Sequence, residues 1–349
     1  MEVRETGVQL LALEDGSRPD PGIQVRRDGR GRYYSAGAFG FGNIITLWDD
    51  RGRFLKSFGR EGDGPGEFSD RGMITIFVDG EDRLHVRDGG FRWSVFSPEQ
   101  EFLGSASASL ASFESGAAVL DIGMAVTTSR DGENYFQIVD SAGAAQRAFG
   151  TIPRKLRGAR VELARDMTYS GGDSFWAGPI AGSPDGYQLE EWGIDGELRR
   201  VFRRTVDWFP PGDPTRLSDG APPPTQVTLL HLDDSGLLYV YGLGPTRHWR
   251  SPASLGRAPT EEEMDRMAHL FVEVIDTKSG RLLASERGLT RTQSLARFPH
   301  GFFRGSKEGY RYRQGDTYGF SWSPRDPRED NPGDLLPAVE IVTVRLVAR

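Results

Sequence analysis

The sequence contains no cysteine among its 349 residues. This absence excludes disulfide bonds, thiolate nucleophiles and cysteine-ligated metal sites. No run of 18 apolar residues occurs either, so the sequence predicts no transmembrane segment. The chain has only five histidines, and none of them has the His-x-x-x-His spacing that places two imidazoles on one metal ion. The Gly-x-Ser-x-Gly motif that marks a serine hydrolase is absent as well.

Basic residues are fewer than acidic ones, with 43 Lys and Arg against 50 Asp and Glu, and the net charge is -7. A protein that binds nucleic acid in general needs a basic surface, so this class of partner is not expected. No hydrophobic signal region follows Met1. The chain is therefore expected either to stay in the cytoplasm or to be secreted or periplasmic with its leader missing from this sequence. The lack of cysteine suits the oxidising compartments, and we predict the second location.

Glycine is abundant, with 45 residues, and it is densest in Phe58–Phe68, where four glycines and one proline prevent a continuous helix or strand. Residues 44–58 before this stretch and 74–86 after it alternate as strands do. The stretch is therefore interpreted as a crossing from the outer strand of one small antiparallel sheet to the inner strand of the next, which is how a β-propeller is connected.

A repeat supports this interpretation, because a strand, a turn with Asp or Gly and a second strand recur along the chain. The copies are residues 44–58, 93–103, 135–149, 187–202 and 271–284, and preceding strands are expected at 31–34, 82–86, 173–176 and 236–240. The last strand, 338–346, has no successor, so strand 8–13 is expected to complete the last blade and close the ring. The predicted fold is all-β: one domain, 1–349, forming a six-bladed β-propeller with four-stranded antiparallel blades.

The stretch Gly59–Phe68, followed by a strand and then by Leu84–Asp88, resembles the bacterial six-bladed propeller proteins related to NHL repeats. The resemblance is specific within residues 44–103 and is only a pattern elsewhere; residues 119–130 and 301–320 depart from it most. It implies a propeller used as a binding scaffold, although a minority of related propellers are lactonases or lyases. It also implies a structural role for Asp88, which matches the turn aspartate of the family.

Three long loops are expected on neighbouring blades and on one face of the ring: residues 209–224, 244–269 and 321–337. Long loops in a compact domain are often functional. We therefore predict that this long-loop face is the binding surface. The alternative is that these loops are tolerated insertions.

Aromatic and cationic residues of the kind enriched at binding hot spots occur in two of these loops. The predicted contact residues are Arg247, His248, Trp249, Arg250, Trp322 and Arg325. Alternatively, Trp249 packs the insertion onto the propeller and the arginines pair with Glu261 or Glu262. A short helix is expected after Thr260, because Thr260 and Glu263 form a capping box.

Other charged groups allow two interpretations each. The arginines of 198–204 could bind a phosphate or an acidic partner, or they could protect an outer strand from edge-to-edge aggregation. His85 is interpreted as a strand residue. The acidic residues of 326–334 lack the order of a calcium loop and are interpreted as a solvated loop.

The function expected from these patterns is that of a non-enzymatic scaffold that recognises a protein, peptide or glycan and needs no cofactor. The alternative is a metal-dependent enzyme of the lactonase or lyase kind, with a divalent metal ion held in the central channel by side chains from several inner strands. A third option is a structural subunit with a flat apolar patch.

Overall fold

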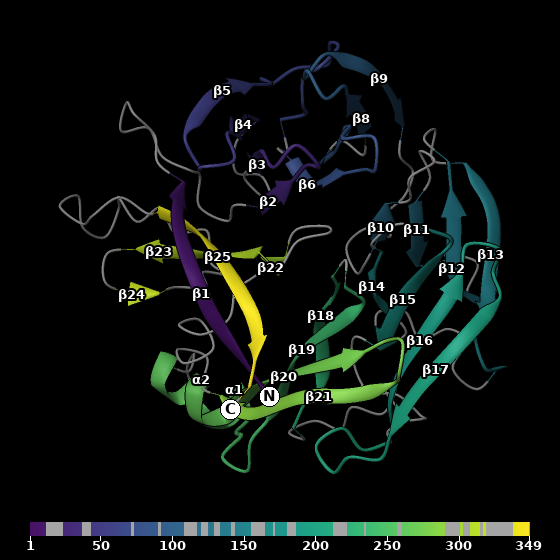
Figure 1. Cartoon of the computed structure of the whole chain (residues 1–349), viewed down its shortest axis with the longest axis vertical. Coiled ribbons are helices and arrows are strands. Elements are labelled where there is room, and N and C mark those ends of the chain that lie inside the picture. Colours follow the sequence, from purple (N-terminus) through teal and green to yellow (C-terminus); the bar gives the residue numbers. More distant parts are fainter. Residues whose placement is uncertain are drawn as a thin grey trace.

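A computed structural model describes most of the chain, and its regular structure is almost entirely β (Figure 1). In the part of the chain that the structure describes, the exceptions are the short helices α1 (Pro252–Leu255) and α2 (Glu261–Met267). Within the described part of the chain, neither helix is long and apolar enough to cross a membrane. The described residues are 1–11, 24–36, 43–70, 73–89, 92–107, 117–119, 125–128, 133–140, 144–154, 165–169, 172–179, 186–211, 222–233, 235–256, 260–289, 301–302, 308–314, 317–318 and 338–348.

Five blades follow one plan, in which four consecutive strands form an antiparallel sheet in their sequence order. Blade one contains β2 (Gln24–Arg27), β3 (Tyr33–Ala36), β4 (Ile45–Trp48) and β5 (Phe54–Phe58). Blade two contains β6 (Met73–Val78), β7 (Leu84–Asp88), β8 (Arg92–Phe96) and β9 (Phe102–Ser107). Blade three contains β10 (Ala117–Val119), β11 (Ala125–Thr128), β12 (Asn134–Val139) and β13 (Ala145–Thr151).

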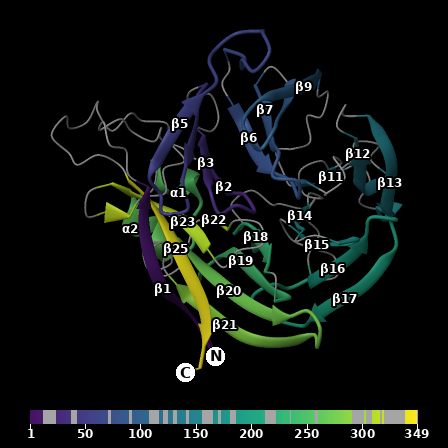
Figure 2. The same ribbon diagram turned by 45° about the horizontal axis from the view of Figure 1, so that its top comes forward.

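Blades four and five continue the plan, and the sheets stand around a common centre (Figure 2). The chain therefore folds as a β-propeller, as its alternating strands and turn residues predict. Blade four contains β14 (Arg165–Thr168), β15 (Ser174–Pro179), β16 (Tyr187–Gly193) and β17 (Leu198–Arg204). Blade five contains β18 (Gln226–Leu232), β19 (Leu237–Pro245), β20 (Ala268–Asp276) and β21 (Arg281–Leu289).

The remaining sheet, here called the terminal sheet, departs from this plan. It has five strands: β22 (Gly301–Phe302), β23 (Glu308–Gln314), β24 (Thr317–Tyr318), β25 (Ala338–Val347) and β1 (Glu2–Leu11). The prediction of six four-stranded blades is corrected to five, because this sheet draws its strands from both ends of the chain and β24 pairs with β23 outside the main order. Strand β1 pairs antiparallel with β25, as predicted, but it begins at Glu2 and not at residue 8.

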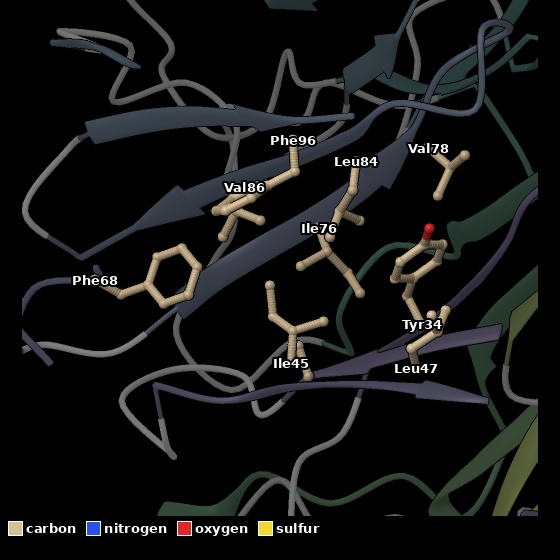
Figure 3. Packing of buried hydrophobic residues seen from close by; sticks show 10 residues of the cluster. Tyr34, Ile45, Leu47, Phe68, Ile76, Val78, Leu84, Val86 and Phe96 are labelled. Atoms are coloured by element: carbon tan, nitrogen blue, oxygen red, sulfur yellow. The ribbon is translucent and has the colours of Figure 1, made fainter. Parts of the chain in front are cut away.

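The apolar core lies between neighbouring sheets, because each sheet buries one face against the next. One cluster joins blades one and two, where Tyr34 and Ile45 meet Ile76 and Val86 (Figure 3). Similar clusters join blade three to four and blade four to five. The terminal sheet packs on both sides: Val342 and Val344 join the blade-five cluster, and Val339 and Ile341 join Val25, Tyr33 and Trp48 of blade one.

The glycine-rich stretch connects β5, the outer strand of blade one, to β6, the inner strand of blade two, as predicted. It is held by its own hydrogen bonds: Gly62 N donates to Phe68 O at 2.9 Å, and Phe68 N donates to Arg60 O at 2.8 Å. The Arg92 guanidinium donates to the carbonyl oxygens of Gly62, Asp63 and Glu67. Phe68 is fully buried in the core between the two blades. The crossing is therefore a tightly bonded loop.

Candidate functional site

The middle hairpin of blade five is longer than its counterpart in blade two. Strands β7 and β8 form four residue pairs, from Leu84↔Phe96 to Arg87↔Trp93. Strands β19 and β20 form nine, from Leu237↔Asp276 to Pro245↔Ala268. At about 3.4 Å per residue, the five extra pairs make this hairpin longer than the blade-two hairpin by about 17 Å. The predicted insertion at 244–269 is thus mounted on a projecting β-ladder.

The insertion is closed at its base by Thr246. Its backbone N–H donates to Met267 O at 2.9 Å, so the last residue of α2 is tied to the first residue after β19. The Thr246 hydroxyl donates to Arg266 O and accepts a bond from His248 N at 3.0 Å. Trp249 N donates to Thr246 O at 3.1 Å, which forms a four-residue turn. The turn Thr246–Trp249 is therefore held through Thr246, which bonds both to the end of α2 and to the turn itself.

The capping box predicted from sequence is confirmed. Thr260 N donates to Glu263 Oε2 at 2.8 Å, and Glu263 N donates to Thr260 Oγ1 at 3.3 Å. Helix α2 begins at Glu261, directly after this box. Arg266 pairs with Glu262 one turn earlier in the helix. Helix α2 contacts strand β20, which follows it directly in the chain.

Four of the six predicted contact residues lie in this insertion. Arg247, His248 and Arg250 are exposed, and Trp249 is half-buried. Glu262 is paired with Arg266, and the Arg247 side chain donates through Nε to His248 Nε2 at 3.1 Å. The alternative in which Glu262 neutralises the loop arginines is therefore wrong; the side chain of Glu261 lies outside the described residues.

Two other parts of the predicted surface lie outside the described residues. These are the whole loop 321–337, with Trp322 and Arg325, and residues 212–221 of the loop 209–224. The acidic residues of 326–334 fall in the same loop. The joint surface of three long loops therefore stays a prediction.

An aromatic cluster supports the base of the insertion, and the sequence interpretation missed it. The Trp208 ring lies 4.3 Å from Phe271 and 5.1 Å from Tyr187, and the Arg287 guanidinium lies 5.2 Å from the Trp208 ring centre. Burial and the positive charge of Arg287 lower the pKa of His269. The available signal was the adjacent pair Trp208-Phe209 at the end of a blade, since paired aromatics rarely occur in a free loop.

The arginines of β17 serve the fold. This strand is the outermost of blade four, as predicted. Arg199 pairs with Asp173 at 2.7 Å, Arg200 pairs with Glu191 at 3.2 Å, and Arg203 donates to Gln188 Oε1 at 2.9 Å. Arg204 reaches into blade five, where its Nη1 lies 2.8 Å from both carboxylate oxygens of the buried Glu273. These partners leave little of the cluster for a phosphate.

His85 lies in strand β7, as predicted, and is buried. Its Nδ1 accepts a bond from Trp93 Nε1 at 3.0 Å, so its Nε2 carries the proton shared with Asp79 Oδ2 at 2.8 Å. Asp79 also accepts bonds from Arg83 N and Nε. Asp88 accepts bonds from Ser69 N and Arg92 N, which agrees with a structural role for this turn aspartate. These groups are engaged in holding blade two.

Polar side chains of the inner strands bond to the backbone of the next blade. Gln24 Oε1 accepts from Ile76 N at 3.2 Å, and Thr168 Oγ1 accepts from Leu232 N at 3.1 Å. Asp166 Oδ2 accepts from Leu230 N, and burial of this carboxyl raises its pKa to about 7. Among the described residues, no group of three or more His, Asp or Glu could hold a metal ion. The described inner strands thus use their polar groups to join blades.

Comparison with known proteins identifies the fold only. No family model matches the chain, and no curated protein matches it. A crystal structure of a Bacteroides fragilis protein provisionally named as exported aligns with 99% of this chain and 96% of its own, with a TM-score of 0.58 and 13% identity. A protein of unknown function from Bacteroides caccae aligns over 77% of this chain and 83% of its own, with a TM-score of 0.43 and 11% identity. The C-terminal WD40 domain of Sif2 aligns over 75% and 71%, with a TM-score of 0.40 and 12% identity. A relation to NHL repeats is not shown by these matches, so the chain is placed among β-propellers without a narrower family.

Proposed function

We propose that this protein is a non-enzymatic binding propeller that recognises a protein, peptide or glycan partner through residues 246–250, which follow the far end of the β19 strand and are here called the tip. The observation that carries the proposal is the combination of a projecting β-ladder and a locked turn with exposed Arg247, His248 and Arg250. A rigid mount lowers the entropy lost on binding. Trp322 and Arg325 are proposed to extend this surface from the neighbouring loop.

The ring behind the tip supports a scaffold role. Apolar clusters join the sheets, and the terminal sheet packs on both blade five and blade one. We infer that the terminal sheet closes the ring between blade five and blade one through the β1–β25 pairing. A closed ring resists separation of its blades, because opening it would expose two apolar faces. The insertion is thus held by an inflexible body.

The proposal includes the absence of a required cofactor and a secreted or periplasmic location. The described polar groups of the inner strands are bonded to neighbouring blades, which favours binding over catalysis at the channel. Metal analysis of protein purified without chelator, with melting curves with and without EDTA, tests the first point. One bound divalent ion per chain and a lower melting temperature in EDTA would favour the enzyme instead. Cell fractionation of the full-length gene product tests the location.

The binding proposal is tested by removing the insertion. Pro245 and Ala268 already pair across the hairpin, so an Asn-Gly turn can replace residues 246–267 without changing the register. The wild-type protein and this shortened protein are used as baits on extracts of the native source, and captured partners are identified by mass spectrometry and confirmed with purified components. We expect the shortened protein to fold and to lose a partner that the wild type binds. Equal capture by both proteins would contradict the proposal.

A further inference from the structure

The turn at the end of the blade-five hairpin presents two guanidinium groups. Arg247 and His248 are the two central residues of the turn that Thr246 O and Trp249 N close. Both of these side chains are exposed. Arg250 follows Trp249, the last residue of the turn, and is also exposed. The tip is therefore a fixed platform for cationic side chains.

His248 orients Arg247. The Arg247 Nε donates to His248 Nε2 at 3.1 Å, so one edge of the guanidinium is occupied. Among the described residues, its Nη1 and Nη2 atoms have no hydrogen-bond partner. This pair of terminal nitrogens forms the planar fork that binds a carboxylate through two parallel hydrogen bonds. His248 acts here as a positioning residue.

Among the described residues, the arginines of the tip differ from others nearby because no acidic side chain pairs with them. Arg266, in the same insertion, pairs with Glu262, and Arg204 in the adjacent blade pairs with Glu273. No carboxylate of the described residues lies within ion-pair distance of Arg247 or Arg250. Within the described part of a chain with a net charge of -7, two neighbouring cations thus have no acidic partner at the end of its longest middle hairpin.

We propose that the tip binds an acidic, extended segment of a protein partner, whose carboxylates pair with Arg247 and Arg250 across the half-buried Trp249. This inference rests on the proposed function and specifies the partner chemistry. Two exposed cations on one short segment can contact successive side chains of an extended chain more readily than they can enclose a small molecule. Carboxylates match the guanidinium fork, and the indole supplies an apolar surface beside it.

The first experiment measures peptide binding by fluorescence anisotropy. The probes are two fluorescein-labelled ten-residue peptides, one alternating Glu and Ser and one alternating Gln and Ser. We expect the Glu peptide to bind at least about tenfold more tightly at 50 mM salt, and this difference to shrink at 500 mM salt, because screening weakens exposed charge pairs. No binding of the Glu peptide at 1 mM protein, or equal binding of both peptides, would overturn the proposal.

The second experiment assigns the binding to the tip. The double variant Arg247→Ala, Arg250→Ala is expected to lower the affinity for the Glu peptide about tenfold. The control variant Arg51→Ala, Arg281→Ala makes the same charge change at two exposed positions elsewhere, one in a turn and one at the start of β21, and should bind as the wild type does. His248→Ala should weaken binding about threefold, and His248→Asn, whose side-chain oxygen can accept the Arg247 bond, should restore it. Equal losses in the tip and control variants would overturn the assignment.

The two proposals can fail separately. If the shortened protein loses its natural partner but the wild type does not bind the Glu peptide, the insertion is a binding surface and the proposal of an acidic partner segment is wrong. If hyaluronan oligosaccharides bind in a tip-dependent way and the Glu peptide does not, the partner is an acidic glycan and the peptide proposal is overturned. If the double variant binds the Glu peptide as the wild type does, the tip is not the acidic site.

Discussion

Arg204 on the outermost strand of blade four donates through Nη1 to both carboxylate oxygens of Glu273 on the third strand of blade five, each at 2.8 Å. The Glu273 side chain is fully buried, and Ser285 Oγ also donates to it at 2.9 Å. A carboxylate in this position needs its counter-ion, because an unpaired buried charge is costly. The pair therefore makes the contact between these two blades depend on one arginine.

Replacing Arg204 is expected to destabilise the protein strongly. Arg204→Ala leaves Glu273 buried without its cation, and we expect the free energy of unfolding to fall by about 3 kcal/mol. Arg203→Ala, which removes a neighbouring bond to Gln188 on the same strand, should cost about 1 kcal/mol or less. Urea denaturation of the two variants gives the comparison. Similar losses of unfolding free energy in both variants would show that the Arg204–Glu273 pair contributes no more to stability than the bond between Arg203 and Gln188.

Asp79 is expected to make the fold sensitive to acid. Burial alone would raise the pKa of this carboxyl, but bonds from His85 and Arg83 outweigh it and lower the pKa to about 2. A carboxyl with a lowered pKa stabilises the folded state above the unfolded value near 4, and this contribution is lost as the pH falls from about 4 to 2.

The variant Asp79→Asn measures that contribution. It should be less stable than the wild type by about 2 kcal/mol at pH 6, and the difference should shrink toward pH 2. Thermal or urea unfolding at a series of pH values follows both proteins. A stability difference that does not change between pH 6 and pH 2 would contradict the assignment of the lowered pKa to Asp79.

Asp166 is expected to have the opposite pH dependence. Burial raises the pKa of this carboxyl to about 7, although bonds from Leu230 N and Met167 N oppose the shift. The folded state therefore retains a proton that the unfolded state loses, and its stability falls as the pH rises from about 4 to 7. Asp166→Asn keeps an acceptor for Leu230 N and carries no charge. It should gain stability relative to the wild type between pH 5 and pH 8 in urea unfolding. Thr168→Val, which removes the adjacent hydrogen bond from Leu232 N, should leave the pH dependence of stability unchanged.

Gly59 is expected to tolerate no side chain. Its φ is +93°, and a Cβ at this position would lie 2.5 Å from the Phe68 ring and 2.7 Å from Asn43 O. Gly59→Ala should lower the free energy of unfolding by about 2 kcal/mol or more, because it adds both backbone strain and a clash. Gly104→Ala is the matched control, since nothing lies within 4 Å of a Cβ there. A neutral Gly59→Ala would mean that the crossing loop can rearrange.

Much of the local structure follows from the sequence, because its causes lie within a few residues. Alternation predicted strands β20 and β21, glycines and aspartates predicted their turn, and Thr260 with Glu263 predicted the start of α2. The order of strands within a blade follows from short connections, since consecutive strands pair with each other. These features required no knowledge of distant residues.

The tertiary structure decided what depends on groups far apart in the chain. It corrected the blade count, because the terminal sheet combines β1 with β25. It also showed that arginines of β17 form ion pairs within the fold, as Arg204 does with Glu273. It also showed that Arg247 contacts His248 and that Glu262 is already paired. Alternation along a strand specifies which face a side chain occupies, but the neighbour across that face is chosen by the packing of whole sheets. The sequence by itself therefore determined a propeller with a long insertion in blade five, and only the packing of its sheets decided which described cations of that propeller are paired with buried carboxylates.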